Sequence, residues 1–184
     1  MIADRPWFLR AVILATIAFA GLWLWMLAVT IPHLSAIAGG LSIFDQRPFG
    51  YTLDDARALV SALGADGGNY YIDVQQRLDA FFPLLQVMTL SGWMVITARH
   101  LRQKGVAGLM TPTILAILLA MVGAVADYGE NGAVRLILEG GVEGLNADLV
   151  SRASAMTQLK FGAGLLAFLV LAGMLALRFR QSRR

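Results

Sequence analysis

Long, mostly apolar runs alternate with more polar stretches along this chain. Each run holds about 20 residues, the length of helix that crosses the hydrocarbon core of a bilayer. The runs cover residues 11–31, 80–98, 106–126 and 159–177. Four such runs in a chain of 184 residues predict an all-α, polytopic membrane protein whose four transmembrane helices pack as one bundle.

The helices should extend slightly past the apolar runs into the interfaces. Pro32 should close the first span, because proline does not readily continue a helix. Gly129 and Gly132 should weaken the third helix where it leaves the membrane. We expect transmembrane helices at about 8–31, 77–98, 107–128 and 157–178, joined by outer loops 32–76 and 129–156, in a single membrane domain of residues 1–184.

The first outer loop should contain a short helix of its own. Thr52 followed by Asp55 is a variant of the capping box, and the apolar residues after it stand at helical spacing as far as Gly64. This amphipathic helix should lie on the outer membrane surface or cap the bundle. Residues 65–69 should form a tight turn into the second span, which Pro83 should kink near the outer interface.

Composition agrees with a membrane protein and removes several classes of chemistry. The chain is 58% hydrophobic and 15% charged, with a mean hydropathy of +0.66. Ordinary soluble domains are about 45–50% apolar and about 25% charged. The chain has no cysteine, which excludes disulfides, thiol redox chemistry and thiolate metal sites.

The basic residues predict how the chain is oriented. Nine of the 15 Lys and Arg residues lie in the N-terminal segment, the connection at 99–104 and the C-terminal tail, beside one acid, Asp4. The positive-inside rule therefore places both termini in the cytoplasm, and the expected location is the bacterial inner (cytoplasmic) membrane. Because these bases serve as topology anchors, no basic patch is left to bind nucleic acid.

A group of polar residues follows directly on the third apolar run. Asp127, Glu130 and Asn131 stand at i, i+3 and i+4, so a helix places all three on one face. Ionisable groups at this depth rarely face lipid, and acids at a helix C-terminus lie at the unfavourable end of its dipole. They should therefore have partners. Lys160 on the fourth span can pair with Asp127 or Glu130, or extend to the lipid headgroups.

A second set of polar residues follows one face of the second span. Asp79, Gln86, Trp93 and His100 recur every seven residues and should face other helices. Two interpretations remain open, namely helix packing alone or a cavity shared with the acids of the third span. The candidate ligand-binding or polar cluster comprises Asp79, Gln86, Asp127, Glu130, Asn131, Thr157 and Lys160. The sequence identifies no catalytic residue, metal-ligand spacing or cofactor, and assigns no role to His33 or His100.

Several short motifs resemble those of a group of small bacterial integral membrane proteins. They are Phe44-Asp45 with Pro48 and Gly50-Tyr51, Asp79 with Phe82-Pro83, Asp127 with Glu130-Asn131, and Thr157 with Lys160. The group has four helices and an Asp-x-x-Glu-Asn motif, and no activity is attached to it. The resemblance implies only that the outer-end polar residues belong together.

Three functions are compatible with these observations. The chain is expected to be an accessory or structural subunit, or an assembly factor, of a membrane complex, with the polar cluster locking its helices. Alternatively, the cluster lines an outward-facing pocket that binds or acts on a lipid-like or small-molecule ligand by acid/base chemistry. A third alternative is a proton-coupled carrier, although transport requires access from both sides of the membrane. Whether the protein is an enzyme stays open, and its expected partners are the bilayer and other membrane subunits or a lipid-like ligand.

Overall fold

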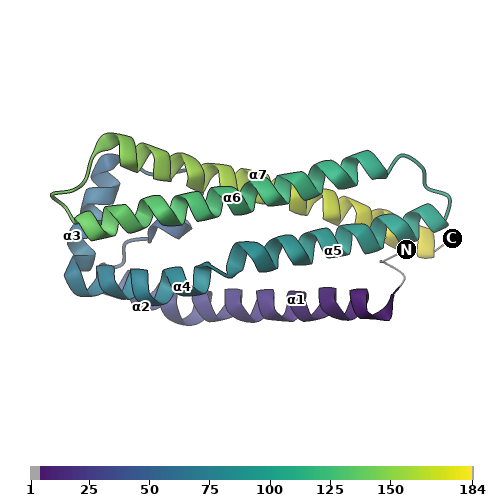
Figure 1. The fold of residues 1–184 in the computed structure, drawn as a ribbon, viewed down its shortest axis with the longest axis horizontal. Helices are drawn as coiled ribbons and strands as arrows, with labels where there is room; N and C mark the ends of the chain where they lie inside the picture. The colour runs from purple at the N-terminus through teal and green to yellow at the C-terminus, as the bar shows by residue number, and fades with distance from the viewer. Residues whose placement is uncertain (1–4, 184) are drawn as a thin grey trace.

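The computed structural model describes residues 5–183, and this part of the chain contains helices and no strand (Figure 1). Four helical segments are long and apolar enough to cross a membrane, which confirms the expected all-α bundle. They span Pro6–Ile37, Leu53–Gln103, Met110–Gly140 and Ala147–Ser182. All four are longer than the sequence predicts, because helix continues through several residues that were expected to end it.

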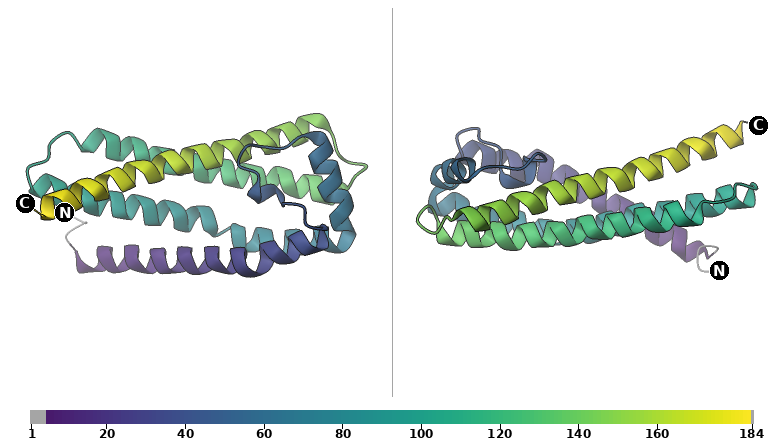
Figure 2. Two further views of the ribbon diagram at one scale, coloured as in Figure 1. Left: turned by 180° about the vertical axis from the view of Figure 1, so that it is seen from behind. Right: turned by 90° about the horizontal axis from the view of Figure 1, so that it is seen from above.

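The two ends of the bundle differ in what they contain (Figures 1 and 2). The first helix begins and the last helix ends at the same end, which we call the terminal end. The opposite end, which we call the distal end, carries loop 38–52, helix α3 and the short connection at 141–146. Which end faces the cytoplasm stays a prediction from the charge distribution.

The first span does not close at Pro32. It consists of α1 (Pro6–Trp25), the π-helical turn η2 (Met26–Thr30) and α2 (Ile31–Ile37). In the π-turn the N–H of Ile31 bonds to the carbonyl of Met26, five residues back. This wider turn makes room for the proline ring and absorbs its missing N–H, so the helix passes through Pro32.

The second span begins in the helix that the first loop was expected to contain. Thr52 and Asp55 cap α3 (Leu53–Tyr70) reciprocally, at 3.1 Å from Asp55 N to Thr52 Oγ1 and 2.8 Å from Thr52 N to Asp55 Oδ2. Gly64 adopts φ +60° and ψ −166°, so the helical path bends there, but helix resumes at once and the turn expected at 65–69 is absent. α3 thus runs across the distal end and leads directly into the second span (Figure 1).

The second span is interrupted near Pro83, as expected. It continues through η4 (Tyr71–Gln75) and α4 (Gln76–Asp79), and after two non-helical residues resumes as α5 (Phe82–Gln103). Pro83 lies in the first turn of α5, where a missing N–H costs no helical hydrogen bond. Asp79 is therefore the last residue before the interruption.

The third and fourth spans are long helices joined by a short turn. α6 (Met110–Gly140) continues past Gly129 and Gly132, so most of the segment expected as the outer loop 129–156 is helical, and only residues 141–146 connect α6 to α7 (Ala147–Ser182). A Cβ placed on Gly129 would lie 3.5 Å from the sulfur of Met156 on α7. Packing along the whole α6–α7 pair therefore outweighs the low helix propensity of glycine.

The buried core has two apolar clusters with polar residues between them. One cluster lies at the distal end and includes Phe44, Leu59 and Ile137. The other lies toward the terminal end and includes Met94 and Ala167. Along both α6 and α7, the residues of the predicted polar cluster lie between the residues of these two apolar clusters. Loop 38–52 and α3 together form what we call the distal cap. The bundle therefore encloses the polar residues at about the depth where this cap begins.

Candidate functional site

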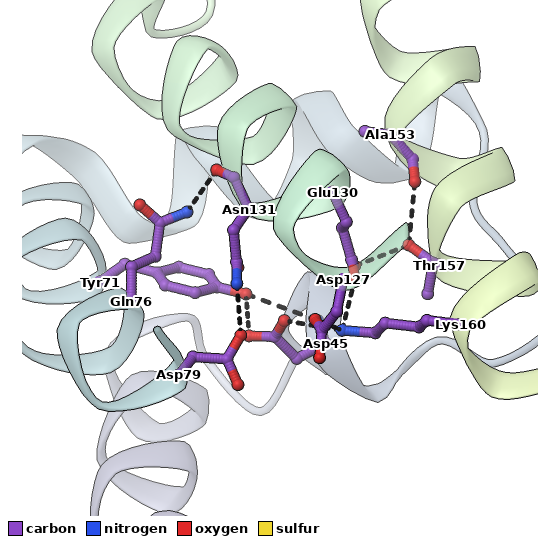
Figure 3. A network of polar contacts seen from close by, with 10 residues as sticks. All are labelled: Asp45, Tyr71, Gln76, Asp79, Asp127, Glu130, Asn131, Ala153, Thr157 and Lys160. Carbon is purple, nitrogen blue, oxygen red and sulfur yellow. Dashed lines mark hydrogen bonds and ion pairs between the residues drawn. The ribbon is translucent and has the colours of Figure 1, made fainter. Parts of the chain in front are cut away.

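Lys160 lies at the centre of a buried group of carboxyl side chains (Figure 3). Its Nζ lies 2.9 Å from Asp127 Oδ1 and 3.4 Å from Asp45 Oδ1, and it also pairs with Glu130 Oε2. The side chains of Lys160, Asp127 and Glu130 are 12%, 6% and 0% exposed. Lys160 therefore pairs with both predicted acids inside the bundle, and does not extend to the lipid headgroups.

The helical spacing of α6 and α7 sets this arrangement. Asp127 and Glu130 share the face of α6 that packs against α7, and Thr157 lies one turn before Lys160 on α7. Thr157 Oγ1 lies 2.6 Å from Glu130 Oε1 and 3.0 Å from the carbonyl oxygen of Ala153. Both Glu130 and Thr157 are fully buried, so the two helices exchange polar contacts where no solvent reaches.

The second span joins the cluster through Asp79. Asn131 Nδ2 donates to Asp79 Oδ2 at 2.6 Å, and Gln76 Nε2 donates to the carbonyl oxygen of Asn131 at 2.9 Å. Asp79 is 4% exposed. The hydroxyl of Tyr128 donates to the carbonyl oxygen of Ala80 at 3.0 Å, which satisfies one acceptor that the helix interruption leaves free. Three spans thus contribute polar side chains to one buried network.

The sequence-based site prediction missed three members of the network, namely Gln76, Asp45 and Tyr71. Asp45 lies in the short turn η3 (Phe44–Gln46), and loop 38–52 folds back so that its carboxylate reaches Lys160. The hydroxyl of Tyr71 donates to Asp45 Oδ2 at 2.8 Å. The Phe44-Asp45 motif in the first loop, an acid directly after an aromatic residue, could have indicated that Asp45 belongs to the site. Local sequence does not, however, determine where such a loop folds.

Gln86 does not join the network. Its side chain is half-buried, and its Nε2 would lie 3.8 Å from a Cβ placed on Gly164 of α7, with no hydrogen bond to the cluster recorded in residues 5–183. Trp93, on the same face, donates from Nε1 to Thr16 Oγ1 of α1 at 3.0 Å. The packing interpretation thus fits Gln86 and Trp93, whereas Asp79 belongs to the cluster. The ring of His33 packs against the ring of Tyr70 in a tilted arrangement, with centroids 4.5 Å apart.

Tyr51 lies between the cluster and a polar cavity of about 340 Å³. Its backbone N–H donates to Ser154 Oγ at 2.8 Å, while its phenol oxygen is buried without a hydrogen-bond partner. Burial raises the pKa of the Tyr51 phenol well above its ordinary value. The cavity is lined by Tyr51, Thr52, Leu53, Ala147, Val150, Ser151, Ser154, Ala155 and Gln158.

The site has more acids than its lysine can neutralise. Three carboxyl side chains, those of Asp45, Asp127 and Glu130, pair with one ammonium group, that of Lys160, and a fourth buried acid, Asp79, is bonded to Asn131 beside them. Within residues 5–183, no three His, Cys, Asp or Glu side chains are arranged to hold a metal ion. The arrangement is chemically suited to holding helices together, and to holding protons on carboxyl oxygens.

No protein family model, curated protein or solved structure matches this chain.

Proposed function

We propose that this protein is a non-enzymatic accessory subunit or assembly factor of a membrane complex, and that the buried cluster locks its distal end. The observation that supports this role most directly is the position of Lys160. One ammonium group on α7 contacts carboxylates from α6 and from loop 38–52, and all of these side chains are at most 12% exposed. Such a contact ties the cap to the helices beneath it.

Loop 38–52 is also tied to the bundle by hydrogen bonds. The hydroxyl of Tyr71 in η4 donates to Asp45, and Ser154 on α7 accepts from the backbone N–H of Tyr51. Gly50 precedes Tyr51 with φ +85°, and a Cβ there would lie 2.6 Å from Ser154 Oγ. The loop therefore packs directly on α7. This supports a rigid surface at the distal end, of the kind that an assembly partner requires.

The first span leaves a broad apolar surface for lipid or for another membrane subunit. α1 packs mainly against α5, and only two of its 20 residues, Val12 and Ala15, are buried. Trp7, Trp23 and Trp25 are about half exposed. Aromatic and aliphatic side chains on one poorly covered helix favour a lateral contact within the membrane.

Native electrophoresis of mildly solubilised membranes tests this proposal. We expect the wild-type protein to migrate in an assembly larger than one chain. Lys160→Met should lose that assembly, because it leaves buried carboxylates without a cation. Arg77→Met, which removes an exposed pair with Asp73 at 2.7 Å, should retain it. Migration of the wild type as a single chain would contradict the proposal.

A second candidate function is ligand binding at the distal end, and the polar cavity beside Tyr51 favours it. A small-molecule or lipid-like ligand there would lie next to the carboxyl cluster, where acid/base chemistry is available. In that case Asp127→Asn and Lys160→Met should fold normally and lose the thermal stabilisation that extracted membrane lipids confer on the wild type. Failure of both variants to fold would favour the structural role instead. Proton-coupled transport gains no support, because the buried charged side chains in residues 5–183 lie toward the distal end.

A further inference from the structure

Thr157 has one hydroxyl hydrogen and two oxygen neighbours that act as acceptors. Its Oγ1 lies 2.6 Å from Glu130 Oε1 and 3.0 Å from the carbonyl oxygen of Ala153. An ionised carboxylate only accepts, and so does a backbone carbonyl. A proton on Glu130 Oε1 makes both contacts hydrogen bonds at once, since Glu130 then donates to Thr157 and Thr157 donates to Ala153.

The charge balance around Glu130 also favours a proton on this side chain. Glu130 is fully buried and shares the Lys160 ammonium with Asp127 and Asp45. Unneutralised charge in a buried site is costly, and carboxyl groups there bind protons to remove it. The charged and titratable groups facing Glu130 are Asp45 and Tyr51 of the loop, Tyr71 and Asp79 of the second span, Asp127 of α6, and Lys160 of α7.

Tyr51 is an independent sign that the cluster communicates with solvent. Tyr51 is 8% exposed, and its phenol oxygen has no hydrogen-bond partner although it faces Thr157 and Glu130. The same residue lines the cavity of about 340 Å³, whose rim includes the exposed residues Ser151 and Gln158. A phenol can donate and accept a hydrogen bond at the same oxygen. Tyr51 is therefore part of the surroundings of Glu130 and also part of the lining of a polar cavity that opens to solvent.

We propose that Glu130 is a proton-binding site and that its proton exchanges with water through Tyr51 and this cavity. In the outward direction the Thr157 hydroxyl turns from Ala153 toward the Tyr51 oxygen, Glu130 O–H gives its proton to the Thr157 oxygen as the Thr157 hydrogen passes to the Tyr51 oxygen, and the phenol hydrogen passes to water. The products are a carboxylate and a hydronium ion, and only O–H bonds break and form. This proton-binding site does not depend on the structural role proposed above. Lys160 can keep its contacts with Asp127 and Asp45 whether Glu130 is protonated or ionised.

Infrared spectroscopy of the wild-type protein tests the occupancy of the site. The chain contains three glutamates, Glu130, Glu139 and Glu143, and the last two are exposed. In protein made with isotopically labelled glutamate, a C=O stretching band of a protonated carboxylic acid at neutral pH therefore reports Glu130. We expect that band to be present and to shift with the label. Absence of a label-sensitive band would show Glu130 to be ionised and would overturn the proposal.

The exchange route is tested by transferring the same protein into heavy water and following the band. Tyr51→Phe should slow its hydrogen–deuterium exchange by at least about tenfold, because the relay oxygen is lost. Tyr128→Phe, which removes a phenol that is 46% exposed, should leave the exchange rate unchanged. Ser151→Trp, which obstructs the rim of the cavity, should also slow exchange and serves if Tyr51→Phe fails to fold. Wild-type exchange rates in both Tyr51→Phe and Ser151→Trp would overturn the route.

Discussion

Asp45 Oδ1 lies 3.4 Å from Lys160 Nζ, although 115 residues separate them in the chain. The contact joins the loop after the first span to the middle of the last helix. Tyr71 holds the other oxygen of the same carboxylate, so Asp45 is fixed from two sides. These two contacts hold loop 38–52 against the bundle. Loss of the Asp45 contact should therefore have a measurable effect on the loop.

Asp45→Asn should loosen loop 38–52. The amide keeps a contact with Tyr71 but loses the charge that attracts Lys160, so we expect a loss of about 1–2 kcal/mol in the free energy of unfolding. Limited proteolysis should then cut the loop faster than in the wild type. Asp54→Asn, which alters an exposed pair with Arg57, is the matched control and should be cut at the wild-type rate.

Lys160→Met should destabilise the protein more than any other single change in the cluster. It leaves buried carboxylates without a cation, which typically costs about 3–5 kcal/mol. Arg77→Met removes an exposed ion pair and should cost no more than about 1 kcal/mol. Unfolding in detergent with added denaturant measures both losses. Similar values for the two variants would show that the buried pairs contribute no special stability.

Asp127→Asn introduced into Lys160→Met should recover part of the lost stability. The second change removes one of the carboxylates that the first leaves unpaired, since Asp127 Oδ1 lies 2.9 Å from Lys160 Nζ in the wild type. We expect the double variant to be more stable than Lys160→Met alone by about 1 kcal/mol or more. A double-mutant cycle measures this coupling, and simple additivity of the two losses would contradict a shared charge network.

Gly50→Ala should destabilise the distal cap through a steric clash. Gly50 has φ +85°, and an added Cβ would meet the side chains of Ser154 and Gln158. Gly39 has φ +64° with nothing within 4 Å of an added Cβ, so Gly39→Ala carries the backbone strain without the clash. We expect Gly50→Ala to cost about 1–3 kcal/mol more than Gly39→Ala in thermal or denaturant unfolding. Equal losses would show that the loop does not pack closely on α7.

Much of the fold could be predicted from local pattern, but element ends could not. The four spans and the Thr52–Asp55 cap follow from runs and spacings within a few turns, and the structure confirms them. Pro32 and Gly129 were read as helix breakers from their intrinsic propensities. A π-turn accommodates the first, and packing against Met156 supports the second. Both are tertiary effects that outweigh a local preference.

The spacing of Asp127 and Glu130 already places both acids on one helix face, and their depth already requires partners for them, because the helical repeat and the cost of buried charge depend on nothing else. The same reasoning makes Lys160 a candidate partner. Tertiary packing brings Asp45, Tyr71 and Tyr51 to this cluster, and it leaves Gln86 outside. Loop 38–52 is positioned by contacts with residues distant in the chain, and no short-range pattern encodes such contacts.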